Sequence, residues 1–581
     1  MPDFRFDGAF GTLYGELGGK EEICELANLT DRSMVKRIHH AYIAAGADAI
    51  KTNTYQANRT VIADERQLRN VIAAGYELAL DAAGDQAKVF ADIGNVAAPL
   101  AEASAACTQT ARIFCELGAG CFLFETLDDI EPVEEAVAYV RENVPGAVII
   151  LSFAVAQDGY TRRGIFYAKL IERALEIADY AGLNCICGPA VMHELAAGLG
   201  RLIPGLDYSR LSLMPNASYP ARQNGRMMFS NNPSYFADKL SLLAALGAGI
   251  IGGCCGTTPA HMEAAYRLLD SASPAAAKMP DPPAVTVRHS ALADFDYSRK
   301  LIAVELNPPL NCDASFFMEA ARRFVDRGAD ALTVTDSPLS RARADTFMLS
   351  AKLRRELGIE VLPHLTCRDR NRVAIKGTLM AASIEEIGSL LAITGDSPDA
   401  MLRADGVKGV YNLSSNGLIS YVDSLNRDVL ASAPYYIAAA LNVNVPNFSA
   451  ELERAKKKLS LGASMLVTQA MFTPESVENL CRARGELPGC RILAGVMPLA
   501  GYKNAMFLSN EVGGITIPQE LCESMKDASP ERTKEISVGY SRSMIEQAWD
   551  FCDGFYLMFP LKKVDFAEAL VDFIKEKDGR L

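Results

Sequence analysis

The sequence lacks the features of several common protein classes. It has 58 Lys and Arg against 71 Asp and Glu, a formal net charge of −13, whereas nucleic-acid binding needs clustered positive charge. No stretch approaches the roughly 20 consecutive apolar residues of a membrane span, and the N-terminal MPDFRFDGAF has no basic start followed by an apolar segment. We therefore expect a cytoplasmic protein that binds neither nucleic acid nor a membrane.

A disulfide framework and a Rossmann-type nucleotide site are also disfavoured. The 14 cysteines are scattered through 581 residues, and thiols stay reduced in the cytoplasm, so clustered cysteines indicate metal ligands or nucleophiles. In the second half, no G-x-G-x-x-G motif opens a helix and no Cys or His cluster has ligand spacing. A dinucleotide-binding Rossmann domain and a metal site are not expected there.

Short β-rich runs alternate with amphipathic helical segments, a pattern typical of parallel sheets and barrels. The first half contains eight such runs: FRFDGA, DAIKTNTY, KVFADIG, CFLFETL, VIILSF, GLNCI, LSLMPNA and GIIGGCC. They end in polar or reactive residues: Asp7, Asn53, Asp92, Glu125, Ser152, Cys185, Asn216 and Cys254. Strand carboxyl ends open on one face of a (β/α)8 barrel, where the active site forms. A doubly wound open sheet is the alternative, but eight units in this length fit a barrel better.

The alternation stops once and then restarts. From Ser271 the sequence SASPAAAKMPDPPAVTV is rich in Ala, Pro and Ser and has no sustained period, which indicates a linker. Eight further runs follow: LIAVELNPP, ALTVTDS, VLPHLTCRD, LLAITGD, YYIAAALNV, SMLVTQAMF, RILAGVMPL and GFYLMFP. We predict an α/β protein with two tandem (β/α)8 TIM-type barrels, at residues 1–270 and 297–581, joined by a linker at 271–296.

The stretch IGGCCGTTP places Cys254 and Cys255 side by side among glycines. A catalytic zinc ion takes three protein ligands and keeps one position open for substrate, and glycines permit the backbone that lets adjacent thiols reach one ion. A third ligand is expected from another strand end, where NCICGP offers Cys185 and Cys187. Strand alternation points both the same way and leaves this choice open. Two buried structural cysteines are the alternative reading of the pair.

Residues 1 to about 265 resemble the homocysteine S-methyltransferase family. The matching motifs are DGAFGT from Asp7, KTNTYQAN from Lys51, FETLDD from Phe124, LNC from Leu183 and GGCCGTTP from Gly252. The resemblance implies a Zn²⁺ site formed by Cys185, Cys254 and Cys255. It also implies that Asp7 and Glu125 bind the amino group of homocysteine. The third run, ADIGNVAAP, lacks the family's usual Gly-Pro pair near the methyl-donor side, which leaves the donor open.

The second half resembles the methylenetetrahydrofolate reductase family over about residues 297–581, through VELNPP, PHLTCRDRN, AITGDSP and VTQAMF. The resemblance implies FAD at the barrel mouth and reduction of 5,10-methylenetetrahydrofolate to 5-methyltetrahydrofolate. Glu305 would be the general acid, with a raised pKa because it must hold a proton near neutral pH. The other implied residues are Asp396 beside flavin and pterin, Gln469 and Tyr502 at the folate, and Thr335, His364, Gly395, Asp396 and Lys458 at the flavin.

Several features of the second half depart from that family or have a structural alternative. His364 could be a core histidine and Lys458 a surface lysine. Thr394 stands where many members have Arg, and GFYLMFP lacks the usual Asn-Arg ending. The reductant is therefore left open between NADH, NADPH and a protein electron donor.

Together the two resemblances predict a bifunctional enzyme that makes methyltetrahydrofolate and methylates homocysteine to methionine. One alternative is a reductase joined to a methyltransferase that uses S-methylmethionine or another non-folate donor, and another is a scaffold that binds a corrinoid protein. We find no cobalamin-binding segment in the sequence, so a separate corrinoid protein is an expected partner of the bifunctional enzyme. A homo-oligomer and channelling between the barrels are left open.

Overall fold

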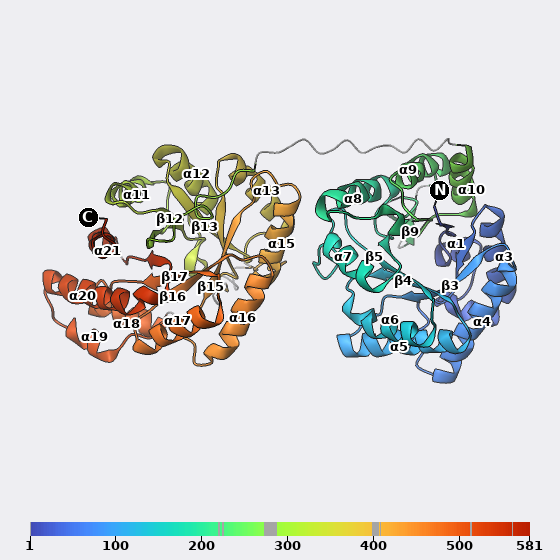
Figure 1. The fold of residues 1–581 in the computed structure, drawn as a ribbon, viewed down its shortest axis with the longest axis horizontal. Coiled ribbons are helices and arrows are strands. Elements are labelled where there is room, and N and C mark those ends of the chain that lie inside the picture. The colour runs from blue at the N-terminus through green and yellow to red at the C-terminus, as the bar shows by residue number, and fades with distance from the viewer. Residues whose placement is uncertain are drawn as a thin grey trace. The chain divides into compact units, whose positions relative to one another are not determined.

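The computed structural model describes residues 2–218, 221–223, 226–229, 231–271, 287–397, 406, 408–511, 514–560 and 562–580, with the backbone alone at 221–223 and 226–228. The chain forms two compact units, Met1–Pro282 and Pro283–Leu581, each drawn in Figure 1 as strands surrounded by helices. The division falls inside the predicted linker, of which residues 272–286 lie outside the described residues.

The first unit is built on eight parallel strands in the order β1-β10-β7-β6-β5-β4-β3-β2. A parallel bridge between Phe6 and Ala49 joins the two ends of this order, so the sheet closes on itself. The strands are β1 (Phe4–Arg5), β2 (Ala49–Lys51), β3 (Lys88–Gly94), β4 (Cys121–Leu127), β5 (Val148–Phe153), β6 (Tyr180–Asn184), β7 (Leu211–Met214) and β10 (Ile250–Ile251). These strands coincide with the eight predicted runs, and the predicted barrel is confirmed.

Helices follow the strands and cover the first barrel. They are α1 (Gly11–Glu16), α2 (Ala27–Thr30), α3 (Arg32–Ala44), α4 (Glu65–Ala83), α5 (Leu100–Glu116), α6 (Glu131–Asn143), α7 (Tyr167–Ile177), α8 (Pro189–Leu202), α9 (Pro233–Ala245) and α10 (Pro259–Ser271). Asp31 and Asp64 accept hydrogen bonds from the backbone N–H groups of the first turns of α3 and α4, which fixes where these helices begin. A short antiparallel hairpin, β8 (Ala221–Gln223) and β9 (Arg226–Met228), was not predicted.

The second unit is a closed barrel of eight parallel strands in sequence order, also as predicted. They are β11 (Leu301–Leu306), β12 (Ala331–Val334), β13 (Glu360–Thr366), β14 (Ser389–Ile393), β15 (Tyr436–Leu441), β16 (Met465–Ala470), β17 (Arg491–Val496) and β18 (Gly554–Leu557). The helices are α11 (Ser315–Arg327), α12 (Thr346–Leu357), α13 (Arg372–Ile384), α15 (Ser415–Arg427), α16 (Phe448–Ser460), α17 (Pro474–Glu486), α18 (Tyr502–Glu511), α19 (Gln519–Ser524), α20 (Pro530–Ala548) and α21 (Val564–Lys577).

The described end of the predicted linker packs on this second barrel. Leu292 is buried in a core cluster with Leu301, Leu362 and Tyr556, and the Ser290 hydroxyl donates to the Glu360 carboxylate at 2.8 Å. Residues from about 290 onward therefore belong to the folded unit.

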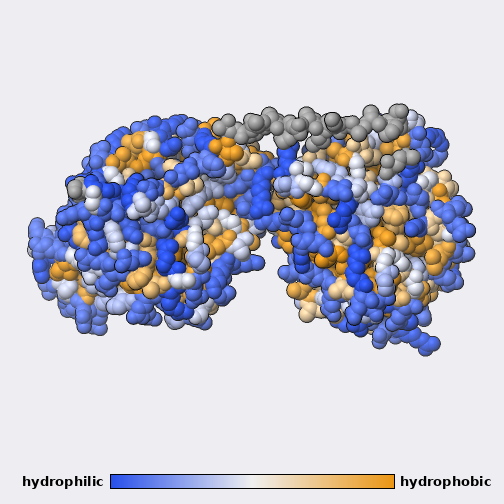
Figure 2. Space-filling view, viewed as in Figure 1, coloured by the Kyte–Doolittle hydropathy of each residue, from blue (hydrophilic) through white to orange (hydrophobic). Residues whose placement is uncertain are grey.

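The surface of the protein is mixed in character. On the face drawn in Figure 2, hydrophilic residues spread over both units with apolar residues between them. Within the described part of the chain, no helix combines the length and the apolar character that crossing a membrane requires.

Candidate functional sites

Three cysteine sulfurs converge at the carboxyl end of the first barrel. Cys185 directly follows β6, and Cys254 and Cys255 come shortly after β10. Their three Sγ atoms lie within 4.8 Å of one another, and the Sγ atoms of Cys185 and Cys255 are 3.6 Å apart. Sulfurs bound tetrahedrally to one zinc ion lie about 3.8 Å apart, given zinc–sulfur bonds of about 2.3 Å. The cluster is therefore close to the geometry of a three-thiolate zinc site.

The backbone after β6 separates Cys185 from Cys187. Cys185 and Ile186 have φ of 59° and 56°, left-handed values that non-glycine residues adopt only where the surrounding fold imposes them. Strand alternation therefore ends at Asn184, and Cys187 is fully buried outside the sulfur cluster. The sequence pattern left this choice open because it assumed a strand that continues through both residues.

Glycine is required beside the cysteine pair. A Cβ on Gly253 would lie 2.5 Å from the Thr257 hydroxyl, and Gly256 has φ of +76° with a Cβ position 2.3 Å from the Phe229 ring. The Thr257 hydroxyl donates to the Cys254 carbonyl at 2.7 Å and accepts from Ala9 N–H at 3.1 Å. These contacts hold the cysteine loop against the end of β1.

A buried lysine lies between the two carboxylates expected to bind an amine. The Lys51 Nζ is 3.5 Å from Glu125 Oε2 and 4.0 Å from Asp7 Oδ1. The backbone N–H of Lys51 donates to Asp7 Oδ2 at 3.0 Å. Asn184 Nδ2 donates to Glu125 at 3.2 Å. Our reading of the motif KTNTYQAN did not assign a role to Lys51. The sequence signal for this role was the position of Lys51, a charged residue at the end of an apolar strand.

Three buried carboxylates share this one ammonium. Burial raises the pKa of Asp7 and of Glu125 to about 7 each, although Lys51 opposes the shift. Burial and the nearby Glu125 raise the pKa of Asp92 as well. Burial lowers the pKa of Lys51, but Glu125 and Asp7 outweigh it and hold the lysine protonated. Among the described residues, Asp7 Oδ1 and Asp92 Oδ1 have no hydrogen-bond partner, so the site can accept a further cationic group.

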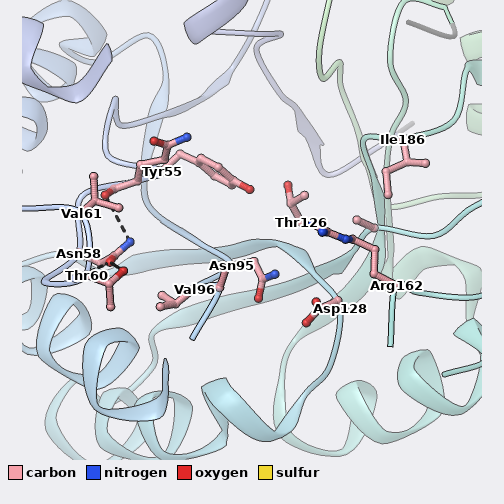
Figure 3. Close-up of a pocket in the computed structure, with 13 residues that line it drawn as sticks. Tyr55, Asn58, Thr60, Val61, Asn95, Val96, Thr126, Asp128, Arg162 and Ile186 are labelled. Carbon is pink, nitrogen blue, oxygen red and sulfur yellow. Dashed lines mark hydrogen bonds between the residues drawn. The ribbon is translucent and has the colours of Figure 1, made fainter. Parts of the chain in front are cut away.

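Two cavities adjoin at this end of the barrel. The inner one, about 410 Å³, is lined by Lys51, Asp92, Glu125 and the three cysteines. The outer one, about 480 Å³, is lined by loops that follow β2 to β6. Figure 3 shows Tyr55 and Thr126 projecting into the outer cavity, with Asp128 and Arg162 on the Thr126 side. Tyr55 and Thr126 also line the inner cavity, so the two cavities share part of their walls.

Inside the second barrel, Glu305, His364 and Tyr556 form one hydrogen-bonded group. Tyr556 is 4% exposed and donates its hydroxyl to Glu305 Oε2. His364 Nε2 lies 3.2 Å from the same hydroxyl. Burial raises the pKa of Glu305, against the Tyr556 hydrogen bond, and lowers the pKa of His364 to about 4. A raised pKa is what the predicted acid role of Glu305 needs. Tyr556 was not among the predicted residues.

The residues predicted to bind the flavin, other than His364, share no hydrogen-bond partner in the part of the chain that the structure describes. Thr335 donates to Asn307 Oδ1 at 2.9 Å, and exposed Asp396 accepts from Leu339 N–H at 2.7 Å. Gly395 has φ of +84°. The Lys458 ammonium donates to the Ala440 carbonyl at 2.6 Å and lies 3.9 Å from Glu451.

The two residues predicted at the folate differ in exposure. Gln469 is exposed near the end of β16, and half-buried Tyr502 starts α18. Tyr502 packs against an apolar cluster that includes Phe472 and Leu499.

The loop between β12 and α12 adds a cation to this barrel end. Arg343 donates to the Pro308 carbonyl at 2.6 Å, and its buried Nε has no hydrogen-bond partner among the described residues. Burial and the nearby Arg341 lower its pKa. The Arg343 guanidinium is therefore incompletely satisfied and can accept a hydrogen-bonding anion.

Comparison with known proteins divides the chain at the same place. Residues 6–269 match the family model described as homocysteine S-methyltransferase, and residues 291–568 match methylenetetrahydrofolate reductase. Methionine synthases of Mycobacterium tuberculosis and Mycobacterium leprae are 28% and 27% identical over 288 residues, 44% of this chain. The matches cover 24% and 23% of those proteins, so the chain spans about a quarter of their length.

Solved structures also match. The homocysteine methyltransferase MmuM of Escherichia coli aligns in its oxidised and metallated forms with 21% and 22% identity and TM-scores of 0.38 and 0.37. These alignments cover 46% of this chain and 95% and 96% of the respective structures.

Proposed function

Because the chain joins a domain of the homocysteine S-methyltransferase family to a domain of the methylenetetrahydrofolate reductase family, we propose that it is a bifunctional enzyme of one-carbon metabolism. The first barrel methylates homocysteine to methionine, and the second reduces 5,10-methylenetetrahydrofolate to 5-methyltetrahydrofolate. Its location in the cytoplasm stays a prediction from the sequence.

The observation that carries the first activity is the convergence of Cys185, Cys254 and Cys255 beside three buried carboxylates. The three thiolates would hold Zn²⁺ and leave a fourth position open; bound zinc lowers the pKa of a thiol and supplies a thiolate nucleophile at neutral pH. Asp7 and Glu125 bind the substrate ammonium, with Lys51 holding both carboxylates in place before substrate arrives. The outer cavity next to Tyr55 and Thr126 admits the methyl donor.

The second activity is supported by the half-buried acid Glu305 and by the contacts around it. A flavin, usually FAD in this family, would be held by Thr335, His364, Gly395, Asp396 and Lys458. It would supply hydride transfer from NADH or NADPH to the folate. Glu305, whose pKa burial raises, would donate the proton that opens the methylene bridge of the folate. Gln469 and Tyr502 bind the folate rings. Lys458 would have to leave the Ala440 carbonyl to reach a phosphate.

The first experiment measures zinc content and the visible spectrum of the purified protein. Homocysteine methylation is then assayed with methyltetrahydrofolate, methylcobalamin and S-methylmethionine offered separately. About one zinc per chain, a flavin spectrum and turnover with methylcobalamin would support the bifunctional enzyme with a separate corrinoid protein. Turnover with S-methylmethionine alone would favour a non-folate donor. Zinc without flavin would contradict the second activity.

A variant test addresses the acid. We expect Glu305→Gln to bind flavin and accept electrons from NADH or NADPH as the wild type does, but to lose folate reduction. Full folate reduction by this variant would remove Glu305 from the proposed mechanism.

A further inference from the structure

Tyr556 connects the acid of the second barrel to three other strands. It lies on β18, its hydroxyl donates to Glu305 on β11, and it accepts from the Thr333 hydroxyl on β12 at 3.4 Å. His364 Nε2, on β13, lies 3.2 Å from the Tyr556 hydroxyl. The centroids of the His364 and Tyr556 rings are 6.4 Å apart in a stacked arrangement. The rest of its surroundings is a core cluster that includes Leu301, Ala303 and Leu362.

One arrangement of protons uses all three contacts of the Tyr556 hydroxyl. A phenol has one proton to donate and two lone pairs that accept. When the proton points to Glu305 Oε2, the oxygen accepts from Thr333 and from a His364 ring that carries its hydrogen on Nε2. A neutral imidazole with its hydrogen on Nε2 can make this bond, and burial lowers the pKa of His364. The Tyr556 hydroxyl then uses its one proton and both of its lone pairs.

From this geometry we propose that Tyr556 is a positioning residue for Glu305: it holds Oε2 and so leaves Oε1 as the oxygen that carries the reacting proton. The inference rests on the proposed reductase function. When Glu305 gives its proton to a folate nitrogen, the carboxylate that remains keeps the hydrogen bond from Tyr556. That bond opposes the burial that disfavours the charged form of Glu305.

The magnitude follows from the type of hydrogen bond. A hydrogen bond to a charged group is stronger than one between neutral groups. If the bond is lost as charge develops on Glu305, the rate of folate reduction falls by about 10- to 100-fold. The pKa of Glu305 rises at the same time, so the alkaline limb of the pH profile moves to higher pH. Among the residues that the structure describes, the titratable groups that contact the Tyr556 hydroxyl are Glu305 and His364.

The test compares Tyr556→Phe with the wild type in the full-length, flavin-loaded protein. Flavin reduction by NADH or NADPH and flavin reoxidation by 5,10-methylenetetrahydrofolate are measured separately by stopped-flow absorbance between pH 6 and 9. We expect reoxidation to slow by about 10- to 100-fold with its alkaline limb shifted upward, while flavin reduction stays within about twofold. Tyr435→Phe is the matched control, because Tyr435 is also buried and its hydroxyl donates to the Leu379 carbonyl rather than to Glu305.

Two outcomes separate the proposals. If the wild-type protein binds no flavin, or its reduced flavin is not reoxidised by the folate, the proposed function fails. If the wild type is active and Tyr556→Phe shows the same reoxidation rate and pH profile, the positioning role is wrong. The double variant Glu305→Gln/Tyr556→Phe tests for a general packing defect. If Tyr556 acts through Glu305, the double variant should reoxidise its flavin about as slowly as Glu305→Gln alone. If Tyr556→Phe slows reoxidation by the same factor in the Glu305→Gln background as in the wild type, the positioning role is also wrong.

Discussion

The buried lysine of the first barrel gives a prediction that the contacts make quantitative. Lys51 Nζ lies 3.5 Å from Glu125 and 4.0 Å from Asp7, and all three side chains are at most 8% exposed. At an effective dielectric constant of about 20, each contact is worth about 4 to 5 kcal/mol of gross attraction. Desolvation of the ammonium offsets most of this gain. Removing one member of a buried ion pair costs about 3 to 5 kcal/mol, since the remaining charge has no partner.

We therefore expect Lys51→Met to destabilise the first barrel by about 3 to 5 kcal/mol. With a denaturant slope of about 5 kcal/mol per M, the guanidinium midpoint falls by about 0.6 to 1 M. The transition is followed by far-UV circular dichroism on metal-free protein. Trp549 is the single tryptophan and lies in the second unit, so its fluorescence reports the second barrel, whose midpoint should not move.

Two further variants test the cause. Lys36→Met removes a lysine that forms an exposed ion pair with Asp81 in the same barrel, and we expect its midpoint to match the wild type. Adding Glu125→Gln to Lys51→Met removes a carboxylate that has lost its partner, so it should restore part of the lost stability. A Lys51→Met protein that unfolds at the wild-type midpoint would refute the electrostatic reasoning.

Three other outcomes are expected. Cys255→Ser should lose bound zinc, measured by metal analysis, and should lose homocysteine methylation as well. Cys187→Ser should keep both. Loss of zinc in both variants would contradict the assignment of Cys185, Cys254 and Cys255 as the zinc ligands. His39 is fully buried, neither ring nitrogen has a hydrogen-bond partner among the described residues, and burial lowers its pKa to about 3. The unfolded chain protonates this histidine more readily than the folded one, so His39 lowers the free energy of unfolding as pH falls from about 6.5 to 3. His39→Leu should make that decline less steep. In denaturant titrations at pH 7, the same variant should raise the stability of the first barrel by about 1 to 3 kcal/mol. Gly256→Ala should lower zinc affinity, measured by competition with a chelator, because a Cβ there meets Phe229; unchanged affinity would show that the loop adapts.

The fold was predictable because its strands and helices follow local hydrophobic patterns in the sequence. Strands buried on both faces, such as β3 and β13, appear in the sequence as short apolar runs, and helical periodicity separates them. The hairpin β8–β9 was missed because its segments are three residues long, too short for a period to show. The segment 287–296, which we predicted to be the end of the linker, packs through single residues such as Leu292, and single residues leave no periodic pattern in the sequence.

The candidate sites were predictable only in part. The sequence by itself determined the two barrels and the position of the polar residues at strand carboxyl ends, because alternation and strand order do not depend on distant contacts. Only the tertiary structure decided which of these residues meet. The left-handed backbone at Cys185 separates it from Cys187, Lys51 reaches two carboxylates on other strands, and Tyr556 meets Glu305 across 251 residues of chain. Barrel closure creates those contacts between strands that lie far apart in the sequence, and no local pattern encodes them.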